Sequence, residues 1–178
     1  YSLVNMNLDG SLGDVTLKNQ PVPYGDKAFG RITAVRHANN KDIWVITRLY
    51  NDDRYISYQV TESGINPNPV LSPTGRYIPI SNIFEGYIKI SGDSRHLICI
   101  NDDVNKNERC LFNSSTGTIE FLFEFENGGR PVGAEMSSDG TYLYISPDVS
   151  SQKLRQFDLS KMDKTSFQES VVEIGDGT

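Results

Sequence analysis

Three stretches of the sequence repeat one pattern, and this repeat limits the possible folds more than any other feature of the chain. The stretches are TAVRHANNKDIWVI, IKISGDSRHLICI and EMSSDGTYLYIS. Each contains a short segment, a polar turn and a compact apolar run that starts at Ile43, Leu97 or Leu143. Ile43 and Leu97 lie 54 residues apart, and Leu97 and Leu143 lie 46 apart. Such spacing is typical of repeated supersecondary units.

Within each unit the residues favour antiparallel strands. YISYQV and TIEFLFEFE alternate between two faces, as half-buried strands do. The turns carry Asn39-Asn40, Asp93-Ser94 and Asp139-Gly140, residue types that tolerate positive φ. Four short strands per unit predict the blade of a β-propeller. We therefore expect an all-β fold, a β-propeller with about three to four blades that belong to a larger seven-bladed ring.

The predicted organisation is one propeller domain or propeller fragment over residues 1–178, with blade-like units near 32–73, 86–126 and 131–174. The segments YSLVNMNLDG and VVEIGDGT already read as strands, so we expect a longer polypeptide. SFQESVVEI is the candidate fourth strand of the third unit. Helical signal is confined to LSKMDKTSF, which could hold a turn or two.

The charge balance narrows the classes of partner. The net charge of the 178 residues is -6 and the sequence pI is about 4.9, whereas nucleic-acid binding needs a basic surface. No apolar run approaches the roughly 18 residues that span a bilayer. We expect no nucleic-acid partner and no membrane insertion.

Cys99 and Cys110 flank a hairpin loop, INDDVNKNER. If the two strands pair symmetrically about this loop, the cysteines face each other at close to disulfide range. The alternative is two small buried apolar side chains. The sequence leaves both open.

The loops between second and third strands emerge on one face of a propeller, and functional residues concentrate in such loops. Arg48, Tyr50 and Arg54 are the candidate anchors, because Arg and Tyr are frequent hot-spot residues. The competing interpretation is a set of solvated turn residues. The whole predicted partner-binding set is Arg48, Tyr50, Asp52, Asp53, Arg54, Asp102, Asp103 and Asp148.

Signals for catalysis or metal binding are sparse. Asp103-x-Asn105-x-Asn107 resembles the start of a calcium loop, but Glu108 occupies the sixth position, at which such a loop has Gly. The sequence has no H-E-x-x-H motif and no G-x-S-x-G motif. We therefore predict no cofactor, no metal and no catalytic residue.

His37 and Trp44 are read as structural residues. His37 and His96 each lie beside a hairpin turn, and His37 is interpreted as a hydrogen-bonding residue of the framework. Trp44, in DIWVI, is expected in the core between blades.

Two segments resemble a known family. VNMNLDGSLGDVTLKN followed by RITAVRHANNKDIWVITR is similar to a WD-repeat-like, YVTN-type propeller of secreted Bacteroidetes proteins, which often carry gliding-motility or type IX secretion sorting domains. GAEMSSDGTYLYIS resembles a blade pattern common to propellers. The sequence departs from the pattern at Ser94, where Gly is usual, and at Gly92, where Pro is usual. The resemblance implies an exported protein of the cell envelope or extracellular space.

The predicted function is therefore a non-catalytic binding or scaffolding module with a protein or glycan partner. Two alternatives remain open. One is a propeller-class enzyme, a lactonase-like hydrolase, for which the inner strands offer only Glu135 and His37 as carboxylate or histidine groups. The other is the propeller cap of a peptidase. Exposed blade faces further predict self-association when the segment is expressed alone.

Overall fold

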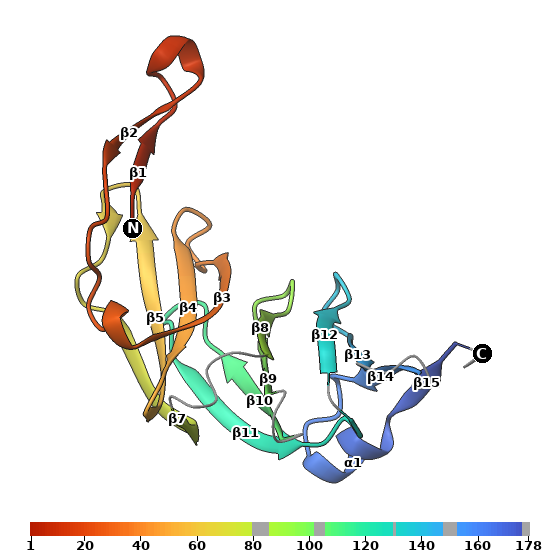
Figure 1. The fold of residues 1–178 in the computed structure, drawn as a ribbon. Coiled ribbons are helices and arrows are strands. Elements are labelled where there is room, and N and C mark those ends of the chain that lie inside the picture. Colours follow the sequence, from red (N-terminus) through yellow and green to blue (C-terminus); the bar gives the residue numbers. More distant parts are fainter. Residues whose placement is uncertain (80–85, 102–105, 130, 148–152, 176–178) are drawn as a thin grey trace.

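The computed structural model describes residues 1–79, 86–101, 106–129, 131–147 and 153–175. Three antiparallel sheets stand side by side in an arc, and a two-stranded hairpin projects from one end of it (Figure 1). The strands pair in chain order, as in a propeller blade, except that β7 of the first sheet pairs with β5 and not with β6. The predicted all-β propeller architecture is confirmed, while the size of a complete ring stays a prediction.

The first blade contains five strands. The four long ones are β3 (Ala28–Arg36), β4 (Ile43–Leu49), β5 (Asp52–Thr61) and β7 (Val70–Ile78). The two-residue strand β6 (Gly64–Ile65) pairs with the end of β5, and β7 pairs with the rest of it.

The second and third blades have four strands each. The second consists of β8 (Gly86–Ile90), β9 (His96–Asn101), β10 (Asn107–Phe112) and β11 (Ile119–Phe125). The third consists of β12 (Pro131–Met136), β13 (Tyr142–Pro147), β14 (Leu154–Asp158) and β15 (Val172–Ile174). The helix α1 (Lys164–Glu169) lies between β14 and β15.

The remaining elements precede the first blade. The hairpin consists of β1 (Leu3–Asn5) and β2 (Asp14–Leu17), with the short 3-10 turn η1 (Asp9–Ser11) between them. A second 3-10 turn, η2 (Gly25–Lys27), leads into β3. None of the described helices has the length and apolar character needed to cross a membrane.

The repeated turns have one backbone geometry. Asn40, Ser94 and Gly140 occupy the same repeat position, and their φ angles are 58°, 61° and 73°. In the second and third repeats, the preceding Asp side chain accepts a hydrogen bond from the backbone N–H two residues on. This local bonding holds the turn, so the turn tolerates Ser94 in place of glycine.

Two hydrophobic cores lie between the blades. The core between the first and second contains Trp44, Ile46, Tyr55, Leu97, Cys99, Cys110 and Phe112, among others. The core between the second and third contains Ile98, Ile100, Phe125, Leu143, Ile145 and Phe157, with Phe167 of α1. The β9 residues alternate between these cores, because successive side chains of a strand point to opposite faces. A middle blade is therefore apolar on both faces.

Candidate active site

The inner strands bring together side chains that are distant in the sequence. β8 lies beside β3 on one side and beside β12 on the other, and each is the first strand of its sheet. In Figure 1 β8 and β12 stand next to each other along the inner side of the arc. Polar residues on these strands can thus form one site shared by several blades.

Lys89 of β8 and Glu135 of β12 form an ion pair across the boundary between the second and third blades. Lys89 Nζ lies 2.7 Å from Glu135 Oε2. The Lys89 side chain is 34% exposed and that of Glu135 is 68% exposed. The hydrogen bond from Lys89 lowers the pKa of Glu135, with a smaller contribution from the Met136 N–H. A carboxylate that stays ionised and an ammonium group thus face solvent together.

Tyr87 lies on the same face of β8 as Lys89, so its side chain is a neighbour of the Lys89–Glu135 pair. Its hydroxyl donates a hydrogen bond to the backbone carbonyl of Val132 in the next blade, while the side chain stays partly exposed. β8 and β12 are therefore joined by an ionic contact and by a neutral hydrogen bond.

Arg31 of β3 lies at the boundary between the first and second blades. Its Nη1 donates to the carbonyl of Ile100 and to Oδ1 of Asn101, both at 2.8 Å. A Cβ added to Gly86 would lie 2.1 Å from the Ile100 carbonyl oxygen and 2.5 Å from Arg31 Cζ. Only glycine fits there, so Gly86 allows the guanidinium to close against β9.

The arrangement places a carboxylate and an ammonium group side by side at a solvent-exposed position. An ionised carboxylate can accept a proton from water, and an adjacent ammonium can stabilise negative charge on a substrate. Within the described residues no group of three or more His, Cys, Asp or Glu side chains is placed to hold a metal ion. The Lys89–Glu135 pair, whose two charged groups both reach solvent, is the candidate functional site.

Sequence reasoning noted Glu135 but missed Lys89, Tyr87 and Arg31. The alternation in GYIKIS places Tyr87 and Lys89 on one face of a strand, which was a usable signal. The pairing with Glu135 was not visible, because it joins residues that lie 46 positions apart.

Arg48 does not lie on an exposed loop, and its prediction as a partner-binding anchor is wrong. It is 1% exposed, at the end of β4, and its Nη1 lies 2.6 Å from Oε2 of Glu108. Burial acts to lower the pKa of Arg48, but the acidic neighbours Tyr55, Cys99 and Glu108 more than reverse this. A charged side chain that is buried in this way cannot reach a partner at the surface.

Glu108 is the centre of a buried polar network. Its carboxylate accepts hydrogen bonds from the Tyr55 hydroxyl and from the backbone N–H of Arg76, as well as from Arg48. Burial raises the pKa of Tyr55. The network joins the first two blades and is structural.

The other predicted partner-binding residues divide into two groups. Tyr50 donates to the Asp26 carbonyl at 2.9 Å, and Arg54 Nη2 lies 2.5 Å from Asp52 Oδ2. The Arg54 hydrogen bond lowers the pKa of Asp52. Asp53 is exposed. These four lie around one turn, whereas the remaining three lie outside the described residues: Asp102, Asp103 and Asp148.

The cysteines do not face each other. Cys99 pairs with Glu108 and Cys110 pairs with Leu97, so the hairpin register differs by two residues from symmetric pairing. Both thiols are free and buried. The structure therefore supports the interpretation of two buried apolar side chains.

The interpretations of His37 and Trp44 are confirmed. The two rings stack with their centroids 5.4 Å apart, and His37 Nδ1 accepts from the Asn39 N–H. Trp44 is buried in the core between the first two blades, and its Nε1 donates to the Ser114 carbonyl at 2.8 Å. Of the calcium-loop residues, Asp103 and Asn105 lie outside the described residues.

Comparison with solved structures supports the propeller fold. A putative 6-phosphogluconolactonase from Bacteroides fragilis matches with a TM-score of 0.58 at 13% identity, over 97% of this chain and 48% of that one. A putative 6-phosphogluconolactonase from Bacteroides uniformis matches with a TM-score of 0.53 at 15% identity, over 91% and 46%. A protein from Lactobacillus plantarum matches with a TM-score of 0.57 at 15% identity, over 98% and 50%.

The chain thus spans about half the length of these structures. No family model matches the sequence, and neither does any curated protein. These neighbours contradict the prediction of a non-catalytic module, because two of them are described as putative 6-phosphogluconolactonases. The expectation that the chain is not part of an enzyme is corrected accordingly.

Proposed function

We propose that the chain forms part of a lactonase-like hydrolase β-propeller that acts on a sugar lactone. The observation that carries the proposal is the exposed Lys89–Glu135 pair on inner strands. The support from the comparisons is a fold shared with putative 6-phosphogluconolactonases. The substrate class is a cyclic ester of a sugar acid, with or without a phosphate group.

The reaction assigns a role to each member of the pair. Water adds to the ester carbonyl while Glu135 takes one of its protons, and the tetrahedral oxyanion forms beside the Lys89 ammonium. The bond between the carbonyl carbon and the ring oxygen then breaks. The ring oxygen receives the proton from Glu135, so one lactone and one water give one hydroxy acid. General base catalysis of this kind contributes about 10²–10⁴-fold to a rate.

Hydrolysis of gluconolactone and 6-phosphogluconolactone above the spontaneous rate tests the proposal, measured by acid release in the polypeptide that carries residues 1–178. Glu135→Gln should lower kcat at least tenfold, and Lys89→Met should lower it too. Glu173→Gln is the matched control, because Glu173 pairs with Arg155 at the outer edge of the third blade. Full activity in Glu135→Gln would exclude Glu135 as the base.

We also propose that the protein is exported and that a protein or glycan binds near Tyr50, Asp52, Asp53 and Arg54. The support for export is the resemblance of VNMNLDGSLGDV and the first repeat to secreted propellers. The support for binding is that these side chains cluster at one hairpin turn. Fractionation of source cells tests export, and recovery only from the cytoplasm would contradict it. Glycan-array binding that Asp53→Ala and Arg54→Ala abolish would support the surface.

A further inference from the structure

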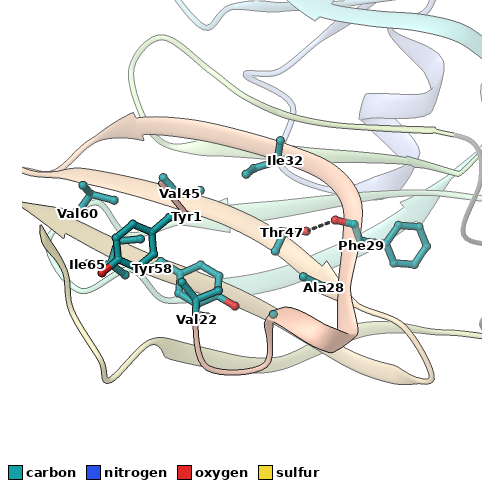
Figure 2. A pocket seen from close by; sticks show the side chains of 11 residues that line it. Tyr1, Val22, Ala28, Phe29, Ile32, Val45, Thr47, Tyr58, Val60 and Ile65 are labelled. Atoms are coloured by element: carbon teal, nitrogen blue, oxygen red, sulfur yellow. Dashed lines mark hydrogen bonds between the residues drawn. The ribbon is translucent and has the colours of Figure 1, made fainter. Parts of the chain in front are cut away.

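One face of the first blade is only partly covered in the described chain. It is the face opposite Trp44, and it includes Tyr58, which is buried, and Val45 and Val60, which are half-buried. Figure 2 shows these side chains around a cavity of about 300 Å³, which Tyr1 and Val22 also line. Ile32, on the same face, is 65% exposed. An exposed apolar sheet face of this kind marks a site where another element or a partner packs.

The repeat shows what covers this face in the other blades. Ile43 of the first blade corresponds to Leu97 of the second and Leu143 of the third, as the repeat spacing sets out. Leu97 and Leu143 are both 0% exposed, because each packs against the preceding blade. Ile43 is only partly buried.

Two neighbouring positions of the first blade are also less buried than their counterparts in the second blade. Val45 corresponds to Cys99, which is 0% exposed. Val60 pairs with Ile43 as Cys110 pairs with Leu97, and Cys110 is also 0% exposed. This partly covered face of the first blade therefore has the apolar positions that a preceding blade would bury.

Half of such a blade is present in the hairpin β1–β2. Its turn, Asp9-Gly10-Ser11-Leu12, matches Thr116-Gly117-Thr118-Ile119, the turn between the third and fourth strands of the second blade. Gly10 and Gly117 have φ angles of 62° and 75°. The hairpin precedes β3 along the chain as β10 and β11 precede β12.

The hairpin lacks its inner partner. β10 pairs with β9 as well as with β11, whereas in the described chain β1 pairs only with β2. Ile119 is buried, but its counterpart Leu12 is 78% exposed. Other large apolar side chains of the hairpin are also exposed: Leu3, Val4, Met6 and Leu8.

We propose that β1–β2 is the outer half of a further blade, which is completed by an inner β-hairpin of the same repeat type that pairs with the open edge of β1. The occupant is a segment of the same polypeptide outside residues 1–178, built like β8–β9, with apolar side chains at alternate positions. Its outward face covers Val45 and Val60, as Ile98 and Ile100 cover the third blade.

The test supplies this hairpin directly. A copy of residues 86–101 is joined by a short Gly/Ser linker ahead of Tyr1, and amide hydrogen exchange is measured in β1. The expected result is exchange at Leu3, Val4 and Asn5 at least tenfold slower than in the unextended chain, with a higher Tm. The matched control carries Ile98→Asp and Ile100→Asp in the added copy only, and it should leave exchange in β1 fast.

Two outcomes would overturn the proposal. One is unchanged exchange in β1 although the three blades stay protected. The other is a stable dimer of the unextended chain by light scattering with β1 already protected, since a second copy would then be the occupant. If the extended chain does not fold, the same hairpin added as a separate peptide to residues 1–178 answers the question by the same exchange measurement.

Discussion

Arg48 Nη1 and Glu108 Oε2 lie 2.6 Å apart, in side chains that are 1% and 0% exposed. The pair joins the end of β4 in the first blade to β10 in the second. It is further held by the Tyr55 hydroxyl and by backbone groups of Arg76. A buried ion pair of this kind contributes little net stability against a hydrophobic replacement, but breaking it leaves one charge unpaired.

Removing one member of this pair is expected to destabilise the protein strongly. Glu108→Gln or Arg48→Met should each lower the free energy of unfolding by about 3–5 kcal/mol, as measured by urea denaturation. The double variant Arg48→Met with Glu108→Leu should recover most of this loss, because it removes both charges.

The control for this prediction is an exposed ion pair. Glu173→Gln removes the partner of Arg155 at a partly exposed site, and such pairs contribute about 0–1 kcal/mol. Equal losses in Glu108→Gln and Glu173→Gln would show that burial does not determine the cost.

Trp44 is expected to be the most sensitive aromatic residue between the first two blades. Trp44→Ala should cost about 3–5 kcal/mol of unfolding free energy, because it leaves a large cavity in the core. Trp44→Phe should cost less, since it keeps part of the packing and loses the hydrogen bond to Ser114. Denaturation curves of both variants check this order, and equal costs would contradict the packing argument.

The features predicted correctly from the sequence are those that local chemistry determines. The turns at Asn40, Ser94 and Gly140 needed residues that accept positive φ, and the apolar runs that follow them had to be buried strands. Trp44 lies within such a run. These features depend on a few neighbouring residues, so periodicity and turn chemistry were sufficient to find them.

The errors concern pairings that depend on distant residues. RLYNDDR was read as a loop, but β4 continues to Leu49 and β5 starts at Asp52, so the turn has two residues and Arg48 is buried. Its partner Glu108 lies 60 positions away. The pairing of Cys99 with Glu108 depends on the register of β9 and β10, which the spacing of the two cysteines does not determine.

In the third blade, SFQESVVEI was expected to be a strand. Its first part is helical instead, because Asp163 caps α1 by accepting from the Ser166 N–H, and Phe167 packs among three other aromatic rings. Such packing is a tertiary contact that overrides local strand preference.

The pKa of Glu135 is predicted to depend on Lys89. The hydrogen bond from Lys89 lowers this pKa in the folded state, so the stabilisation is present above the unfolded pKa of about 4.3 and is lost as the pH falls through the folded value. Lys89→Met should therefore raise the Glu135 pKa, as measured by NMR titration of its side-chain carboxyl carbon.

The same change should move the acidic limb of a pH–rate profile for lactone hydrolysis to higher pH. Lys153→Met, at a residue outside the pair, should leave the Glu135 titration where it is. An unchanged titration in Lys89→Met would show that the 2.7 Å contact does not persist in solution.

Both cysteines are predicted to be unreactive in the folded protein. Burial raises the pKa of Cys99 and that of Cys110, and the thiolate is the reactive form. An aromatic disulfide reagent at pH 8 should modify neither thiol in the native state and both in guanidinium chloride without a reductant. Failure to modify either thiol in denaturant would indicate a disulfide, and rapid modification in the native state would show that the core between the first two blades opens.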